Sequence, residues 1–142
     1  MDDDSPVREL TLDECWDFLA TQELGRLAFR LTDDVHLVPV NYAVDGRTLL
    51  FRTAPGTKLV GVELGGSVAF EVDEVDGETA RSVVIRGRAR RLEEPDEYRA
   101  DNIALHVWVD TPKYFVVELA PDEITGREFS LHRPWRRIRP AD

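Results

Sequence analysis

Hydrophobic and polar residues alternate along several short stretches of this chain, and that spacing constrains its fold more than any other feature. In one stretch, the side chains of Leu27, Phe29 and Leu31 would all lie on the same face of a strand. The dipeptides Asp45-Gly46 and Asp76-Gly77 are typical of hairpin turns, because glycine tolerates positive φ. Strand-like patterns cover residues 26–31, 35–44, 48–53, 68–73, 79–92, 114–120 and 124–131. The pattern predicts an antiparallel, mostly β domain.

Two residues inside these stretches indicate how such a sheet could curl. Pro39 cannot donate a ladder hydrogen bond, so it predicts an edge, a bulge or a gap in the pairing. Gly87 lies within the long stretch 79–92, where it would permit a bulge or a tight bend. We therefore expect a β-barrel of about six to seven antiparallel strands, with two or three short helices. Residues 1–142 fit a single domain of ordinary size.

Short helices are predicted at the start of the chain, at residues 58–64 and from residue 93 to about 105. The first carries a capping box, in which Thr11 is the N-cap and Glu14 follows three residues later. Four apolar residues then recur with helical spacing: Leu12, Cys15, Trp16 and Leu19. This spacing predicts that all four lie on one buried face of the helix.

Charge and cysteine content exclude several classes of partner and site. The formal net charge of −10 argues against general nucleic-acid binding, which needs a basic face. Cys15 is the single cysteine, and His36, His106 and His132 lack the spacing of a zinc site. No apolar stretch approaches the ~20 residues that span a bilayer, and the acidic start (MDDD) is unlike a signal peptide. We expect a cytoplasmic protein that binds neither membranes nor nucleic acid.

One stretch combines the groups that a phosphate needs. Arg52 supplies a fork of donors and Lys58 a point charge, while Thr53 and Thr57 add hydroxyl groups. A helix that begins after Gly56 would present backbone N–H groups to an anion. The alternative is that Arg52 and Lys58 are ordinary solvated surface charges.

Several segments occur in an order that is similar to a known family. They are residues 23–28 (ELGRLA), 39–42 (PVNY), 51–53 (FRT) with 56–59 (GTKL), 68–73 (VAFEVD), 82–87 (SVVIRG) and 124–127 (ITGR). This ordered set resembles the pyridoxamine 5′-phosphate oxidase-like family of flavin-binding split barrels, in its small actinobacterial branch. The resemblance covers roughly residues 9 to 131.

The resemblance implies a split β-barrel that forms a homodimer with two FMN sites at the subunit interface. It places the flavin ring against the strand at Val40, Asn41 and Tyr42. It also places the phosphate near Arg52, Thr53 and Lys58. Phe51 and Thr57, in the same stretch, are further candidate cofactor-binding residues. Relatives often carry tryptophan where this chain has Arg81, just before Ser82. Arg81 would then either remove an aromatic platform for the flavin or add a cation for a phosphate.

Three functions follow from these observations. The first is a flavin-dependent oxidoreductase, in which the cofactor carries the redox chemistry of a small-molecule substrate. No side chain is an obvious acid or base, so we assign no catalytic residue. The second is a non-catalytic module that holds FMN, a deazaflavin or haem, with His132 as the candidate haem ligand. The third is a degenerate barrel that acts as a dimeric interaction protein.

Overall fold

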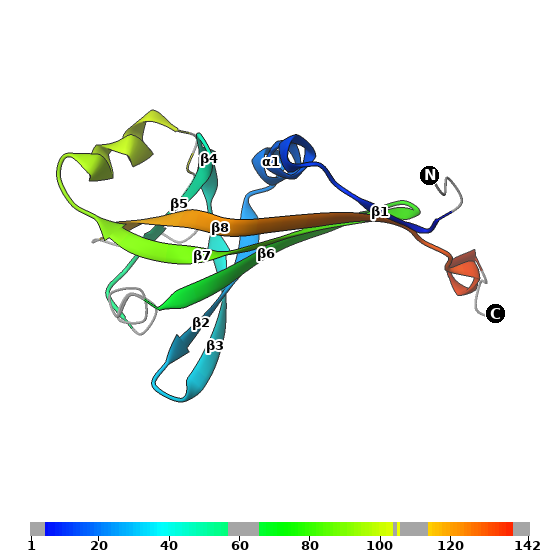
Figure 1. Ribbon diagram of the computed structural model, residues 1–142, viewed down its shortest axis with the longest axis horizontal. Coiled ribbons are helices and arrows are strands. Elements are labelled where there is room, and N and C mark those ends of the chain that lie inside the picture. Colours follow the sequence, from blue (N-terminus) through cyan, green and yellow to red (C-terminus); the bar gives the residue numbers. More distant parts are fainter. Residues whose placement is uncertain (1–4, 57–65, 104, 106–113, 138–142) are drawn as a thin grey trace, which may run out of the picture.

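One antiparallel sheet that curls into a half-barrel organises the computed structural model, which describes residues 5–56, 66–103, 105 and 114–137 (Figure 1). The strands run in the order β3-β2-β6-β7-β8-β5-β4, and β1 pairs with β8. Their bounds are β1 Val7–Glu9, β2 Leu24–Leu31, β3 Asp34–Asn41, β4 Ala43–Asp45, β5 Thr48–Thr53, β6 Ser67–Asp76, β7 Thr79–Leu92 and β8 Phe115–Ser130. The helical elements are α1 (Leu12–Thr21) and two 3₁₀ helices, η1 (Asp96–Asn102) and η2 (Pro134–Arg137). The expected mostly β split barrel is confirmed.

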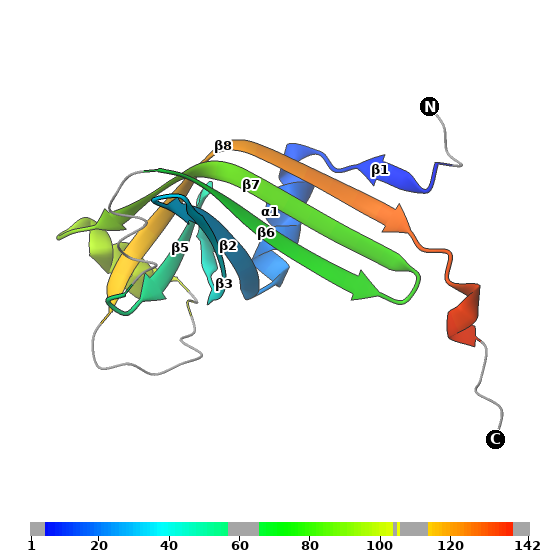
Figure 2. The ribbon, with the colours of Figure 1, turned by 90° about the horizontal axis from the view of Figure 1, so that it is seen from below.

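The predicted turns form, one position later than the dipeptides suggested. Asp45 and Asp76 end their strands, and the glycines that follow them, Gly46 and Gly77, each have φ of +61°. These turns create the β4–β5 and β6–β7 hairpins. In Figure 2, β6, β7 and β8 extend together toward the end of the molecule where β1 lies.

The predicted edge and bulge are also confirmed. Pro39 lies in β3, the edge strand next to β2, where a missing N–H costs no ladder bond. The β7–β8 register shifts between Arg86 and Gly87. A Cβ atom at Gly87 would lie 2.2 Å from the carbonyl oxygen of Ala120, so the backbones approach too closely there for a side chain.

Three expectations need correction. Residues 114–120 and 124–131 form one strand, β8, because the bulge opposite Gly87 bends the ladder without ending it. Conversely, the stretch 35–44 divides into β3 and β4 at Tyr42, whose N–H donates to the carbonyl of Glu23 (2.9 Å). The expected helix after residue 93 is only the short η1, and β1 was not anticipated. The helix predicted at residues 58–64 lies outside the described residues.

The capping box of α1 is confirmed, since Glu14 N–H donates to Thr11 Oγ1 (3.2 Å) and Thr11 N–H to Glu14 Oε1 (2.9 Å). The predicted apolar face is wrong at Leu12, which is 58% exposed, whereas Phe18 is buried. At about 100° per residue, Leu12 lies on the same side of the helix as these buried residues, but it is the first residue of the helix and remains exposed there.

Two hydrophobic clusters lie on opposite faces of the sheet. The main core lies inside the barrel, and it contains the buried side chains of α1 together with Leu49, Phe51 and Leu119. A second, smaller cluster contains Leu50, Leu92, Ala100, Leu105 and Val116, with η1 contributing Ala100. Successive strand residues face opposite sides, so Leu49 and Leu50 enter different clusters. Among the described residues, no helix is long and apolar enough to cross a membrane.

Candidate functional site

Arg52 is the first of the predicted cationic residues within the part of the chain that the structure describes. It lies near the end of β5 on the sheet face that carries η1, and its side chain is 23% exposed. The guanidinium donates to Asp101 Oδ1 of η1 (3.3 Å) and lies 5.7 Å from the centre of the Tyr114 ring. A guanidinium has five N–H donors, so this arrangement leaves it capacity for a further acceptor.

Thr53 does not share this surface with Arg52. As the next residue along β5 it faces the barrel interior, where it is 4% exposed. Its hydroxyl donates to the carbonyl oxygen of Ala54 (3.2 Å). The side chain of Phe51 is likewise inside, fully buried in the main core. Only backbone atoms of these two residues remain for a ligand next to the guanidinium.

The side chains of residues 40–42 likewise alternate between the core and the outer face of the sheet. Val40 and Tyr42 are buried in the main core, and Tyr42 Oη donates to the carbonyl oxygen of Leu19 (2.6 Å). Burial raises the pKa of the Tyr42 hydroxyl well above its usual range, so this group stays a neutral structural donor. Asn41 is half-buried and points away from the core, and β3 contacts β5. Asn41 is therefore the residue of this segment whose side chain can join Arg52 on the outer face.

Arg81 and Ser82 lie at the other end of the sheet. Arg81 lies 5.2 Å from the Phe18 ring of α1 and 3.4 Å from Glu74 Oε1, while Ser82 faces the opposite side of β7. Arg81 also lines a cavity of about 250 Å³ whose other charged residues are Arg8, Glu14, Asp17 and Glu128. Three carboxylates against two arginines make this cavity a poor place for a phosphate.

Within one subunit, the predicted residues around Arg52 lie far from the predicted residues Arg81 and Ser82. In the ladder, Arg52 pairs with Val116 of β8 and Arg81 pairs with Glu128 of the same strand, 12 residues further on. At about 3.3 Å per residue, this separation is roughly 40 Å along β8. The ten predicted cofactor-binding residues therefore belong to at least two places, and Thr57 and Lys58 lie outside the described residues.

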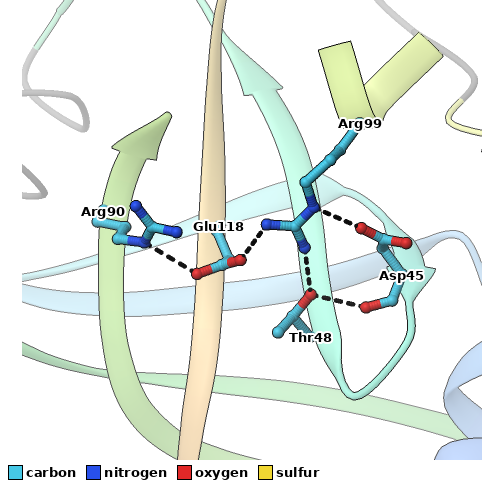
Figure 3. A network of polar contacts seen from close by, with 5 residues as sticks. All are labelled: Asp45, Thr48, Arg90, Arg99 and Glu118. Carbon is cyan, nitrogen blue, oxygen red and sulfur yellow. Dashed lines mark hydrogen bonds and ion pairs between the residues drawn. The ribbon is translucent and has the colours of Figure 1, made fainter. Parts of the chain in front are cut away.

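A polar network beneath η1 was not predicted from the sequence (Figure 3). Glu118 of β8 has a side chain only 9% exposed, and it accepts from Arg90 Nε (3.0 Å) and from Arg99 of η1. Arg99 also donates to Asp45 Oδ2 (2.7 Å) and to Thr48 Oγ1 (3.0 Å). The network fixes η1 on the β4–β5 hairpin and on β8.

This network holds its carboxylate in the charged form. Burial by itself would raise the pKa of Glu118, but the hydrogen bonds from Arg99 and Arg90 outweigh it and leave the pKa below its usual value. The contacts join residues 19 to 54 positions apart in the chain, so no local pattern could have revealed them. Nor could a local pattern have revealed that Asp101 and Tyr114 lie beside Arg52.

Comparison with known proteins identifies the family. Residues 11–128 match the pyridoxamine 5′-phosphate oxidase family, and this chain belongs to it. A candidate pyridoxamine 5′-phosphate oxidase from Corynebacterium glutamicum is 40% identical, with a TM-score of 0.80, over 91% of this chain and 98% of that one.

Two solved relatives are described as binding a flavin. The FAD-binding protein from Mycobacterium smegmatis is 40% identical, with a TM-score of 0.77, over 88% of this chain and 100% of that one. An FAD-binding protein from Mesorhizobium loti is 26% identical, with a TM-score of 0.79, over 89% of this chain and 100% of that one. The resemblance inferred from the ordered segments is thus confirmed at the level of the family.

Proposed function

We propose that this chain binds a flavin nucleotide through its phosphate at Arg52, does so as a homodimer, and uses the flavin in oxidation–reduction. The observation that carries the proposal is the placement of Arg52 on an outward-facing surface, with donors available beside an aromatic ring. The solved relatives described as FAD-binding proteins support the same class of ligand. FMN, predicted from the sequence, is the smallest flavin that meets this requirement.

The residues around Arg52 fit a flavin phosphate in charge and in chemistry. A guanidinium binds phosphate oxygens through paired N–H donors, and such charge-assisted bonds are about twice as strong as neutral ones. The chain as a whole is acidic, at −10, so a nearby cation is needed to hold an anion. Asn41, on the same outer face, would add an amide that can both donate and accept.

A second copy of the chain would complete such a site. The outer face at Arg52 forms one side of the site, and Arg81 and Ser82 of β7, which pair with β8 about 12 residues beyond the partner of Arg52, lie too far away to form the other side in the same subunit. A homodimer can bring that distant region of one subunit to Arg52 of its partner. We therefore propose that the cofactor lies at a subunit interface.

A bound flavin would supply the electron and hydride chemistry, since cofactors carry such reactions and the protein supplies binding and orientation. In this chain Arg52 would anchor the phosphate, and the half-barrel would present an outward surface for the rest of the molecule. Tyr42 is not a candidate proton donor, because its hydroxyl is buried and bonded to Leu19.

Equilibrium titration with FMN, FAD and riboflavin tests the proposal. Arg52→Ala should weaken FMN and FAD binding by roughly 10- to 100-fold, because a hydrogen bond to a charged group contributes about 1.5–3 kcal/mol. Riboflavin has the same ring and no phosphate, so its affinity should barely change. Lys58→Ala should behave like Arg52→Ala if Lys58 shares the phosphate.

Arg47→Ala is the matched control, since Arg47 carries the same charge and lies in the turn of the same hairpin, where it pairs with Asp13. It should leave all three affinities unchanged. Equal losses of FMN and riboflavin in Arg52→Ala would indicate damage to the fold. Unchanged FMN and FAD affinity would place the phosphate elsewhere. Reduction of the bound flavin by NADH or NADPH then separates an oxidoreductase from a carrier.

A further inference from the structure

The residue that contacts the Arg52 guanidinium is an acid held in place by the rest of the fold. Asp101 lies in η1, two residues after Arg99 and one after Ala100. Arg99 is bonded to Glu118, Asp45 and Thr48, and Ala100 is 2% exposed in the second hydrophobic cluster. Asp101 is therefore held beside Arg52 by a segment that is anchored to β8 and to the β4–β5 hairpin on the outer face of the sheet.

Asp101 itself is not part of that anchoring. Its side chain is 65% exposed, and a surface ion pair of this kind contributes little to stability. The fold thus keeps an acid 3.3 Å from the cation that would bind a phosphate, without needing it for its own stability. Any phosphate at Arg52 must either share the guanidinium with this carboxylate or displace it.

We propose that Asp101 is a specificity-determining residue of the Arg52 site, which favours ligands whose phosphates each carry a single negative charge over dianionic phosphate monoesters. The inference rests on the proposed function, because it assumes that Arg52 binds the phosphate of a flavin. Of the two flavin nucleotides, Asp101 should therefore weaken the binding of FMN more than the binding of FAD.

Coulomb repulsion at short range between the Asp101 carboxylate and the phosphate produces this preference. A phosphate monoester such as FMN carries about −1.5 to −2 charges at pH 7 on a single phosphate group. In FAD the phosphates are linked as a pyrophosphate diester, and each bears one charge. The carboxylate of Asp101 contacts Arg52, well inside the screening length of about 8 Å, so salt does not remove this repulsion. A dianion next to it is penalised about twice as much as a monoanion.

Asp101→Asn removes the charge and keeps the shape of the side chain. Affinity for FMN should rise about tenfold and affinity for FAD about threefold, since one unit of charge near 4 Å in a watery environment is worth a few-fold in binding. Riboflavin affinity should stay within about twofold, because riboflavin carries no phosphate charge. The measurement is titration calorimetry with each of the three ligands, at one pH and one salt concentration.

Asp96→Asn is the matched control, because Asp96 is an exposed acid at the start of the same 3₁₀ helix. It should change FMN and FAD affinity by the same small factor. Asp101→Glu keeps the negative charge, so its ratio of FMN affinity to FAD affinity should stay close to that of the unaltered protein.

Three results would overturn the inference. If Asp101→Asn changes FMN and FAD affinity equally, or no more than Asp96→Asn does, Asp101 does not discriminate between phosphates. If FMN affinity falls in Asp101→Asn, the carboxylate assists binding and the proposal is wrong. If the unaltered protein binds neither FMN nor FAD, the proposed function itself fails and takes this inference with it.

Discussion

Replacing Glu118 by glutamine tests whether the network beneath η1 stabilises the fold as the structure suggests. The side chain is 9% exposed and accepts from two arginines, so the substitution removes a buried charge while keeping an oxygen acceptor. Hydrogen bonds to charged groups contribute about 1.5–3 kcal/mol each. Arg90 is 59% exposed, so its bond to Glu118 contributes only about 0.5 kcal/mol to the free energy of unfolding, as a surface ion pair does.

The bond from Arg99, which is 32% exposed, carries most of the effect. Glu118→Gln should therefore lower the free energy of unfolding by about 2 kcal/mol at pH 7, or about 4–8 °C in Tm. Chemical denaturation of both proteins at one fixed protein concentration measures this difference in the free energy of unfolding. Glu123→Gln is the control, because Glu123 lies on the same strand, is 58% exposed and pairs with Arg86 at 3.9 Å. That variant should differ from the parent by less than about 0.5 kcal/mol.

The pH dependence provides a second test. The folded-state pKa of Glu118 is lowered, so its contribution is fully present above the unfolded-state value near 4.5 and is lost as pH falls through the folded value. The stability difference between the parent and Glu118→Gln should thus be full at pH 7 and shrink below about pH 4.5. A difference that is absent at pH 7, or one that does not change in acid, would refute the reasoning.

Three further predictions follow from single contacts and from the proposed assembly. Gly126→Ala should destabilise the protein by about 1–3 kcal/mol, because the new Cβ would lie 2.5 Å from Cys15 Sγ, and adding Cys15→Ala should recover part of the loss; two additive effects would contradict this contact. Tyr42→Phe should cost about 1 kcal/mol in urea denaturation, because it removes the stronger of two donors to the Leu19 carbonyl and leaves the Gln22 N–H at 3.3 Å, and an unchanged midpoint would show that the Tyr42 bond is unimportant. Sedimentation equilibrium at micromolar concentration should give twice the 16.2 kDa chain mass, and a monomer that still binds flavin would contradict the proposed homodimer.

The local features of the fold could be predicted from the sequence. The hairpin turns at Gly46 and Gly77, the edge position of Pro39 and the bulge at Gly87 each follow from the backbone chemistry of one residue. The failures came from tertiary context. Leu12 lies on the same side of α1 as the buried residues, yet it is exposed at the first position of the helix, and a bulge does not end β8 as a turn would.

The candidate site divides in the same way. Arg52 was identified from its residue type and from the glycine loop after it, and the structure places it on an outward surface. The sequence could not show that Thr53 faces inward, that Arg81 lies far from Arg52 in the sheet, or that Asp101 contacts Arg52. These facts depend on strand register and on contacts such as that between positions 52 and 101, which local patterns do not encode.

Native mass spectrometry of the protein, after incubation with excess FMN or FAD and removal of free ligand, tests the central claim most directly. It reports the ligand mass and the number of subunits in one spectrum. We predict a dimer that carries flavin, with the bound fraction sharply reduced in Arg52→Ala and unchanged in Arg47→Ala. A protein that retains neither FMN nor FAD, or an Arg52→Ala variant that retains flavin as fully as the parent, would contradict the account.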